Sequence, residues 1–537
     1  MNSYPVAFVS FEEFDNLGVG YMASLLSDNG YKPWIIDFRY GKEEILRVLT
    51  KLKPYVVGFS VIFQYHIYEF RRLMNYLRKG GIKCHFTAGG HYASLRYEEL
   101  FELIPSLDSV VRFEGEYTML ELVYNICSKS DWRKIKGIAY KENGKISANP
   151  LRPLEKDLDR FPFPTRLPPA EYALDKKFAT ILAGRGCIHD CAFCDIREFY
   201  QQPPGPYKRI RRPEMVVREM ELLYHEKDCS VFLFQDDDFP IKTDKGSEWI
   251  SNFCKGLKDK RLHNKIMWKI NCRPDEVDYE SFALMKNHGL FLVFLGIEDG
   301  TNTGLIRLNK HMTVARSLEG INTLKNLEIG FDYGFMLFQP ASTFRMIHQN
   351  LDFLKLICGD GYTPVSFLKM LPYFETKVEK ELLRDGRLKG KPGFLDYDFL
   401  DKSIDLYFSF INDRFLKWLM DPEGLSNISK WARNYISLFS KFYKKDPEVI
   451  MISEDVRKII SESNNYLLET MKDLANLFET REFKNTTEHD ELKHFNKEIR
   501  QKHNHFKEKI NDCMTKLLYI YQTVRQVQDV ESGSLVF

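Results

Sequence analysis

Short apolar runs alternate with amphipathic stretches in the first 125 residues of this 537-residue chain, and this alternation constrains the fold most. The amphipathic stretches, such as YEFRRLMNYLRKGG, have a helical spacing of apolar residues and end in glycine, a common helix stop. Strands that alternate with helices predict right-handed crossovers and a parallel sheet covered on both faces. We therefore expect a doubly wound domain of about five strands, formed by the runs PVAFVS, PWIIDF, YVVGFSV, KCHFTAGG and DSVVRFEGE.

A second alternating series begins near residue 175. Helical patterns such as RPEMVVREMELLYHEK separate its apolar runs, and acidic or polar residues follow several runs directly. Six strand–helix units of this kind predict a partial TIM-type β/α barrel, whose chemistry takes place at the carboxyl ends of the strands. The six runs are FATILAG, CSVFLFQDDDF, KIMWKINCR, LFLVFLGIED, GFDYGFMLFQP and PVSFLKMLPYF.

The rest of the chain divides into a linker and a helical extension. Five prolines in residues 151–170 predict an extended linker, and after about residue 390 apolar residues recur three and four apart, which predicts helices. We expect an α/β protein with four parts: a Rossmann-like (flavodoxin-like) domain at 1–145, a proline-rich linker at 146–174, a partial barrel at 175–385 and an all-helical domain at 386–537.

Charge and hydropathy exclude several classes of partner. Lys+Arg 77 balance Asp+Glu 75, so no basic surface for nucleic acid is expected. The first residues lack the basic and apolar regions of a signal peptide, and no run reaches the roughly 18 apolar residues of a membrane span. We therefore expect a cytoplasmic protein without a membrane span.

Three cysteines lie close together in GRGCIHDCAFCDI: Cys187, Cys191 and Cys194. The other seven cysteines are scattered and are expected to be small buried side chains. A structural zinc site closes with four ligands, and a four-iron cluster usually has four cysteines. Three thiolates would leave one iron open to a small chelating molecule, which is typical of a catalytic site; a zinc site or a chance grouping is the alternative.

The segment CIHDCAFC resembles the signature of the radical S-adenosylmethionine (SAM) enzymes, with the aromatic Phe193 before the last cysteine. This resemblance implies a [4Fe-4S] cluster on the three cysteines, with SAM on the open iron and a 5′-deoxyadenosyl radical as the reactive species. The segments GIEDG, NCRPDEVD and QDDDF resemble further parts of the family's SAM site. They imply that Glu298, Arg273 and Asp237 contact SAM; a guanidinium can pair with the SAM carboxylate, and a carboxylate with its amine.

Residues 5–125 resemble the cobalamin-binding domain found ahead of one large group of radical SAM enzymes, through NLGVGYMASLL, VGFSV, TAGGHYAS and VVRFEGEYTMLEL. The motif that carries a lower-ligand histidine, D-x-H-x-x-G, is absent; EFDNLGVG stands there, which is similar to the base-off, histidine-off subgroup. A generic flavodoxin-like module is the alternative. The resemblance implies a cobalamin site formed by Gly18, Gly20, Ser60, Gly89, Gly90, His91, Glu114, Gly115 and Glu116.

Together these resemblances cover about residues 1–375 and imply a cobalamin-dependent radical SAM methyltransferase. The methyl group would pass from methylcobalamin to an unactivated carbon of a natural product, peptide or lipid. Radical rearrangement or cyclisation without methyl transfer is one alternative, and a non-catalytic iron–sulfur protein is another. We expect a flavodoxin or ferredoxin as electron donor, and the helical extension could close over the gap between corrin and barrel and select the substrate.

Overall fold

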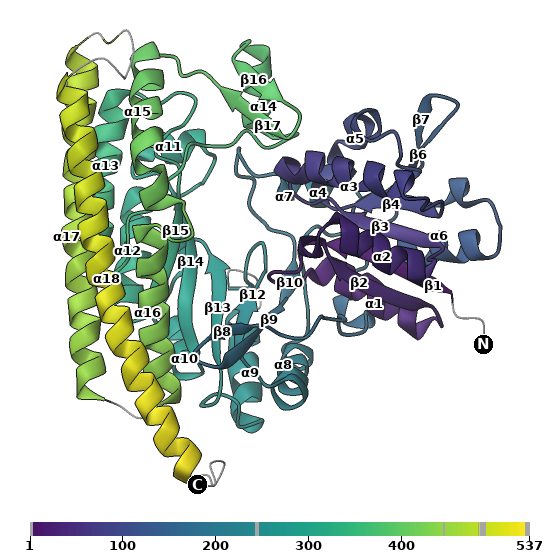
Figure 1. Cartoon of the computed structure of the whole chain (residues 1–537), viewed down its shortest axis with the longest axis horizontal. Helices are drawn as coiled ribbons and strands as arrows, with labels where there is room; N and C mark the ends of the chain where they lie inside the picture. Colours follow the sequence, from purple (N-terminus) through teal and green to yellow (C-terminus); the bar gives the residue numbers. More distant parts are fainter. Residues whose placement is uncertain (1–3, 242–245, 444–445, 482, 484–489, 532–537) are drawn as a thin grey trace.

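The structure of the chain is a computed structural model that describes residues 4–241, 246–443, 446–481, 483 and 490–531. Figure 1 shows an N-terminal domain on the right, a curved sheet in the middle and a layer of long helices on the left. Among the described residues, no helix combines the length and the apolar character that a membrane span requires.

The N-terminal domain contains a seven-stranded sheet in the order β2-β1-β3-β4-β5-β6-β7. The first five strands pair in parallel, which confirms the predicted doubly wound sheet. The last two are antiparallel and extend the sheet to Ala148. The strands are β1 (Pro5–Ser10), β2 (Lys32–Asp37), β3 (Val56–Ser60), β4 (His85–Gly89), β5 (Ser109–Val111), β6 (Ile138–Glu142) and β7 (Lys145–Ala148).

Helices cover both faces of this sheet because strand side chains alternate between the faces. In β1, Val6 and Phe8 belong to one buried cluster, whereas Ala7 and Val9 belong to another. The helices α1 and α6 pack on the first face, and α2 and α3 pack on the second. The helices of this domain are α1 (Leu17–Asp28), α2 (Lys42–Leu52), α3 (Ile67–Lys79), α4 (His91–Leu95), α5 (Tyr97–Leu103) and α6 (Glu116–Cys127).

The middle of the chain forms a six-stranded half-barrel sheet in the order β15-β14-β13-β12-β9-β8, in which only β8 pairs antiparallel. The strands are β8 (Glu171–Ala173), β9 (Lys176–Ile181), β12 (Cys229–Phe234), β13 (Met267–Cys272), β14 (Leu290–Glu298) and β15 (Gly330–Phe335). A short hairpin, β10 (Gly184–Arg185) and β11 (Arg209–Ile210), lies beside it. The helices between these strands are α7 (Ile196–Gln201), α8 (Pro213–Lys227), α9 (Gly246–Asp259), α10 (Tyr279–Asn287), α11 (Asn302–Arg307), α12 (Val314–Asn326) and α13 (Phe344–Cys358).

The sequence predicts a sixth parallel strand at 364–374. This prediction is wrong, because the segment does not form a full strand. A single parallel bridge joins Phe338 to Lys369, and the Leu368 and Met370 amides donate to Phe335 and Phe338 carbonyls at 2.9 and 2.8 Å. The run has prolines at positions 364 and 372, and proline has no amide hydrogen for a ladder. The segment therefore follows β15 without becoming a regular strand.

The C-terminal part is helical, as predicted, except for one hairpin after helix α14 (Lys377–Arg384). The hairpin strands are β16 (Leu388–Lys391) and β17 (Phe394–Tyr397), so the expectation of no strands here is wrong. These strands are four residues long and mostly exposed, and such short polar strands leave no alternating pattern. The helices that follow are α15 (Lys402–Leu419), α16 (Leu425–Phe442), α17 (Pro447–Thr480) and α18 (Asp490–Glu531).

These long helices lie on the side of the barrel away from the N-terminal domain (Figure 1). The expectation that they cover the gap between the two α/β domains is therefore wrong. The C-terminal part of the chain reaches the N-terminal domain through the segment 371–397, which we call the strap. Its Phe374 packs on Tyr92 with ring centroids 5.2 Å apart, and its Glu379 accepts from Arg96 at 2.7 Å.

Candidate active site between the two α/β domains

The three clustered cysteines lie on one loop that follows β9 and β10 at the carboxyl edge of the half-barrel. The loop is fixed by its backbone: the Cys194 amide donates to the Cys191 carbonyl at 3.2 Å and the Ala192 amide donates to the Leu308 carbonyl at 2.9 Å.

A glycine sets the turn at the start of this loop. Gly186, directly before Cys187, has φ +80°, and a Cβ there would lie 1.8 Å from the Tyr207 carbonyl oxygen. Only glycine allows this close turn, which places all three thiols half-buried.

The electrostatic setting of these thiols suits a cationic cluster. Burial raises the pKa of Cys187 to about 12 and raises the pKa of Cys194 well above its usual value. Both thiols also lie near Cys191, so three thiolates would repel one another without a bound cation. A metal bound to a thiol deprotonates it and supplies the missing positive charge.

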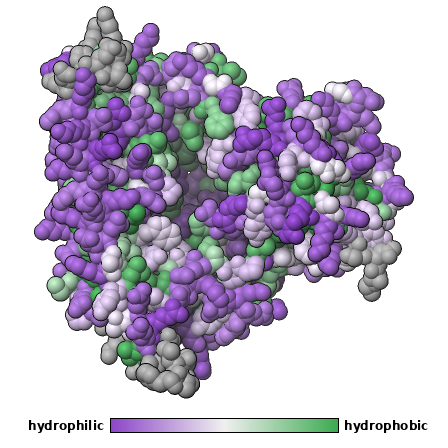
Figure 2. All heavy atoms as spheres, viewed as in Figure 1, coloured by the Kyte–Doolittle hydropathy of each residue, from purple (hydrophilic) through white to green (hydrophobic). Residues whose placement is uncertain are grey.

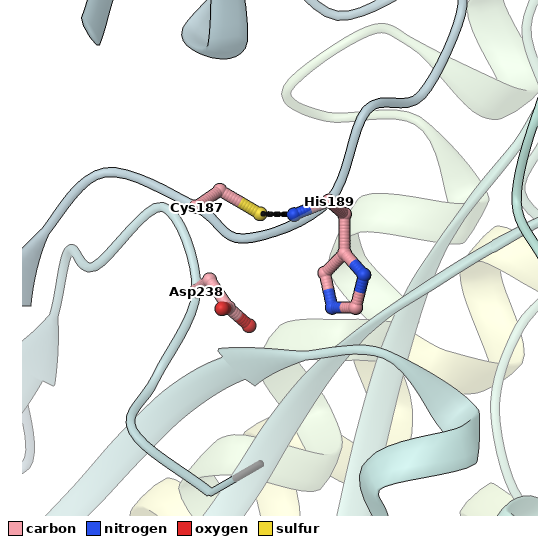
Figure 3. Close-up of side chains that lie close together, drawn as sticks. All are labelled: Cys187, His189 and Asp238. Carbon is pink, nitrogen blue, oxygen red and sulfur yellow. Dashed lines mark hydrogen bonds between the residues drawn. The ribbon is translucent and has the colours of Figure 1, made fainter. Parts of the chain in front are cut away.

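One compact donor group includes Cys187. Its sulfur, a nitrogen of His189 and a carboxylate oxygen of Asp238 all lie within 4.8 Å of one another (Figure 3). Among the described residues this is the one such group, so the three cysteines do not form a compact mononuclear site. In a four-iron cluster each thiolate binds its own iron, so wider spacing is what a cluster needs.

His189 and Asp238 already have protein partners. His189 Nε2 lies 3.0 Å from Oε1 of Glu276, and Lys208 Nζ lies 3.5 Å from the Asp238 carboxylate. Burial raises the pKa of Asp238 to about 6, and nearby Glu276 adds to this rise. These contacts give both side chains a role that requires no mononuclear metal.

Arg273 and Glu298 lie on neighbouring strands of the barrel and face its interior. Arg273 donates through Nε to Asp275 at 2.8 Å and through Nη2 to the Lys310 carbonyl, whereas its buried Nη1 has no hydrogen-bond partner among the residues that the structure describes. Glu298, in a left-handed conformation with φ +69°, has Oε1 3.9 Å from Lys310 Nζ. The site thus offers one free guanidinium nitrogen and one carboxylate, which together suit a zwitterionic amino acid group.

The three consecutive aspartates after β12 have different environments. Asp236 is buried and accepts from the amides of Ala183 and Gly184 at 3.0 and 2.6 Å, so it holds the chain before the cysteine loop. Asp237 accepts from the Gly186 amide at 3.0 Å and is accessible from the cavity described next. Phe193 is partly buried against the core of the barrel.

A cavity of about 770 Å³ lies at the carboxyl edge of the N-terminal sheet. Asp237, Gly184 and Arg185 of the barrel line it too, so the cavity extends from one α/β domain to the other. Figure 2 shows a hollow between the two halves of the molecule, with green and pale side chains on its wall. Eight of the residues that were predicted to form the cobalamin site line this cavity: Gly18, Ser60, Gly89, Gly90, His91, Glu114, Gly115 and Glu116.

Gly20 is the exception among the predicted residues, because it does not line the cavity. A Cβ at Gly20 would lie 2.5 Å from the Thr165 carbonyl oxygen, so this glycine allows the linker to pack closely on α1. Gly18 and Gly20 are two residues apart on a helix and therefore face different sides of it. The structure therefore gives Gly20 a packing role at the linker, and its contact with the ligand stays a prediction.

Gly90 and His91 form the turn between β4 and α4 at the cavity wall. Gly90 has φ +108°, and a Cβ there would lie 2.8 Å from the Val61 carbonyl oxygen. His91 stacks on Phe199 with ring centroids 4.1 Å apart, and burial lowers its pKa, so the ring is favoured in its neutral form. This turn brings backbone, rather than side chains, up to the cavity.

Residues 5–123 match the B12 binding domain family, and residues 181–354 match the radical SAM superfamily. The chain belongs to the cobalamin-dependent radical SAM family. Both matched segments contribute to the cavity wall.

Three related proteins illustrate the range of the family. An uncharacterized methyltransferase of Pyrococcus horikoshii is 26% identical over 370 residues, which are 67% of this chain and 77% of that protein. An anaerobic magnesium-protoporphyrin IX monomethyl ester cyclase of Rubrivivax gelatinosus is 30% identical over 67% of this chain and 66% of that protein. A cytidylyl-2-hydroxyethylphosphonate methyltransferase of Streptomyces wedmorensis is 23% identical over 69% of this chain and 78% of that protein.

Two solved structures share the fold. The cobalamin-dependent S-adenosylmethionine radical enzyme OxsB, with aqua-cobalamin and S-adenosylmethionine bound, superposes with a TM-score of 0.67 at 18% identity, over 100% of this chain and 82% of that chain. The radical S-adenosylmethionine methyltransferase TsrM of Kitasatospora setae has a TM-score of 0.62 at 18% identity, over 73% of this chain and 80% of that chain.

The cofactors of a cobalamin-dependent radical SAM enzyme are cobalamin, a [4Fe-4S] cluster and SAM. The residues present fit all three groups. Three half-buried thiols on one loop suit the cluster, the unpartnered Nη1 of Arg273 and the Glu298 carboxylate suit SAM, and a large glycine-lined cavity suits a corrin.

Sequence reasoning missed the ion pairs that join the two domains. Glu114 accepts from Arg185 at 3.1 Å and from Arg209 at 2.7 Å, and Glu116 accepts from Arg185 at 2.7 Å. Burial alone would raise the pKa of Glu114, but Arg185 and Arg209 outweigh it and lower that pKa. Both glutamates therefore hold the barrel against the N-terminal domain as well as lining the cavity.

An aromatic group on the cavity wall was also missed. Phe11 stacks on His66 with centroids 4.2 Å apart, and Phe63 stacks on Tyr65 at 5.3 Å. The run IFQYHIY at 62–68 was the available signal, since aromatic residues there do not follow a core periodicity.

Proposed function

We propose that this radical SAM enzyme is a C-methyltransferase that acts on an unactivated carbon of a small natural product, peptide or lipid. One observation carries the proposal: the cavity of the B12-binding domain reaches Asp237, which holds the Gly186 amide at 3.0 Å next to Cys187. A methyl donor in this cavity would therefore lie beside the site where the radical forms. When bound, cobalamin supplies a methyl group, and the cluster with SAM supplies a radical that abstracts hydrogen.

The residues of the chain would bind, orient and shield the reactants. Cys187, Cys191 and Cys194 would hold the cluster, while Arg273 and Glu298 would orient SAM through its carboxylate and amine. The loop is held in turn by Asp236 and Asp237 through backbone amides. This arrangement would fix the reactive groups on strand ends and on a loop that backbone hydrogen bonds hold in place, as positioning requires.

The strap would exclude water from the reacting atoms. Its Tyr373 lies near Cys194 and near Tyr65 of the B12-binding domain, so it spans the space above the cysteine loop. Arg96 anchors it through Glu379 at 2.7 Å and Glu375 at 3.2 Å. Exclusion of water and oxygen protects radical intermediates from side reactions.

The test uses anaerobically purified protein loaded with cobalamin, a chemical reductant and SAM that carries a trideuterated methyl group. We expect S-adenosylhomocysteine and a trideuterated methyl group on the bound corrinoid, measured by mass spectrometry without any substrate. Formation of 5′-deoxyadenosine without either product would support rearrangement or cyclisation instead. If SAM is not cleaved at all, the protein would be an iron–sulfur protein without turnover.

Cyclisation or rearrangement is the second candidate. The relative from Rubrivivax gelatinosus, 30% identical, is a magnesium-protoporphyrin IX monomethyl ester cyclase, and its alignment covers 67% of this chain, as large a share as that of the methyltransferase of Pyrococcus horikoshii. For either reaction we propose a flavodoxin or ferredoxin as the electron donor. The labelled methyl experiment separates the two reactions, because only methyl transfer requires the label on the corrinoid.

A further inference from the structure

The interior of the half-barrel has a defined set of side chains. Trp268 points outward, packing on Phe253 of α9 with centroids 5.4 Å apart. Because strand side chains alternate, Lys269, Asn271 and the following Arg273 point inward.

The neighbouring strands follow the same rule. Phe294 of β14 and Asp332 of β15 face the interior, and Phe294 pairs in register with both Asn271 and Asp332.

The wall of this interior is apolar and accessible. Phe294 is 39% exposed, Leu368 is 43% exposed and Leu371 is 46% exposed, so these apolar side chains are accessible to a ligand. A Cβ on Gly334 would lie 3.5 Å from Phe294, so this glycine leaves room beside the ring. Phe14 of the B12-binding domain, 50% exposed, packs on Phe178 of β9 with ring centroids 5.9 Å apart.

Lys269 is a cation in this apolar setting. Lys269 Nζ is 5.7 Å from the centroid of the Phe294 ring, and within the described part of the chain no carboxylate reaches ion-pair distance of it. The nearest acidic group, Asp332, is already paired with Arg433 of α16 at 2.6 Å. Burial lowers the pKa of Lys269, which is the expected effect on a cation without its own partner.

We propose that the barrel interior binds a substrate with an apolar body and an anionic end group, a carboxylate or a phosphate, and that Lys269 pairs with this end group. The proposal rests on the proposed function, since it assigns a substrate class to the same active site. The apolar body would lie against Phe294, Leu368 and Leu371.

Two physical arguments favour this occupant. A lysine in apolar surroundings is destabilising unless it is paired, so a bound anion would recover the lost interaction. Lys269 precedes Arg273 by four strand residues, which is roughly 13 Å along β13 at about 3.3 Å per residue. A substrate whose anion binds Lys269 would thus place a carbon several bonds away at the SAM end of the barrel.

The test measures binding of three probes with the same chain: octanoate, octyl phosphate and octanol. Isothermal titration calorimetry is performed anaerobically on the holoenzyme with cobalamin, cluster and SAM. We expect at least one anion to bind about ten-fold more tightly than octanol, since each ten-fold step corresponds to about 1.4 kcal/mol. The tighter of the two anions identifies the end group as carboxylate or phosphate.

Three variants assign the preference to one residue. Lys269→Met keeps the apolar stem and should abolish the preference, whereas Lys269→Arg should retain it. Lys177→Met is the matched control, because Lys177 lies on β9 of the same sheet and pairs with Asp228 at 3.5 Å on the surface. Equal binding of octanol and both anions, no binding of either anion, or a preference that survives in Lys269→Met would overturn the inference.

The proposed function is tested separately on the wild-type protein. If corrinoid methylation occurs but the anion preference is absent, the inference fails and the proposed function stands. If the preference is present but neither SAM cleavage nor corrinoid methylation occurs, the proposed function fails.

Discussion

The two cofactor-binding regions of this protein are built on different principles. The barrel end is a compact set of charged and thiol side chains from one loop and two strand ends, many of them buried. The cavity of the B12-binding domain is shaped mainly by backbone turns and aromatic rings from several distant loops. A site that depends on a few functional groups should fail completely when one is removed, whereas a site that depends on shape should fail in proportion to the space that is filled.

The largest effect is expected at the barrel end. Cys194→Ala should reduce both iron content and SAM cleavage to background, because three thiolates are the minimum that leaves only one iron open. Iron analysis and chromatography of 5′-deoxyadenosine measure this. Cys127→Ala, at a half-buried cysteine on α6 outside the motif, should change neither quantity. Continued deoxyadenosine formation by Cys194→Ala would remove the proposed cluster from this loop.

A smaller but selective effect is expected in the cavity. Gly90→Ala places a Cβ 2.8 Å from the Val61 carbonyl oxygen at φ +108°, so the turn that lines the cavity must shift. We expect bound corrinoid to fall by about ten-fold, equivalent to about 1.4 kcal/mol, with iron content preserved. Gly30→Ala is the control, since Gly30 has φ +82° with nothing within 4 Å. Full corrinoid loading in Gly90→Ala would place the ligand elsewhere.

Glu298→Gln tests the SAM end by removing one charge. A hydrogen bond to a charged group contributes about 1.5 to 3 kcal/mol, so SAM affinity should fall by about ten-fold or more while the cluster absorption remains. Glu328→Gln is a suitable control, because Glu328 also has a left-handed backbone, with φ +52°, but is exposed. Unchanged SAM affinity in Glu298→Gln would show that this carboxylate does not contact SAM.

The same carboxylate predicts a pH dependence. Burial raises the pKa of Glu298, although Lys310 and Arg273 oppose the rise. The charged form that pairs with the SAM amine is present above this raised pKa, so SAM affinity should fall as the pH decreases through it. Titration of SAM affinity should show this fall in the wild type, and the fall should be absent in Glu298→Gln.

The smallest effect is expected where the two regions are joined by the strap. Arg96→Met removes the pairs with Glu379 and Glu375, and because Arg96 is partly exposed the loss should be about 1 kcal/mol. We expect a few-fold faster proteolysis within residues 371–397. Arg47→Met, which removes an exposed pair with Glu44, should leave the rate unchanged. An unchanged rate in Arg96→Met would mean that packing of strap side chains such as Phe374, and not the ion pairs, holds the strap.

Local patterns in the sequence were sufficient to predict most of the fold. The alternation in residues 5–116 predicted the five parallel strands, and five of the six expected barrel strands formed. The sixth did not become regular because prolines 364 and 372 interrupt its hydrogen bonding, and the β16–β17 hairpin has no apolar alternation to signal it. The packing of Gly20 could not be predicted from local patterns, because its close contact is with Thr165, far away in the sequence.

The sequence by itself determined the two α/β units, the cysteine loop and the glycine turn at Gly90, because each depends on residues that are neighbours in the chain. The tertiary structure alone decided which groups from different units meet: Arg185 with Glu114, Asp237 with the cavity wall, and Lys269 with an apolar interior. Such pairings depend on how the two sheets pack against each other. That packing results from many weak contacts, and no single stretch of sequence encodes it.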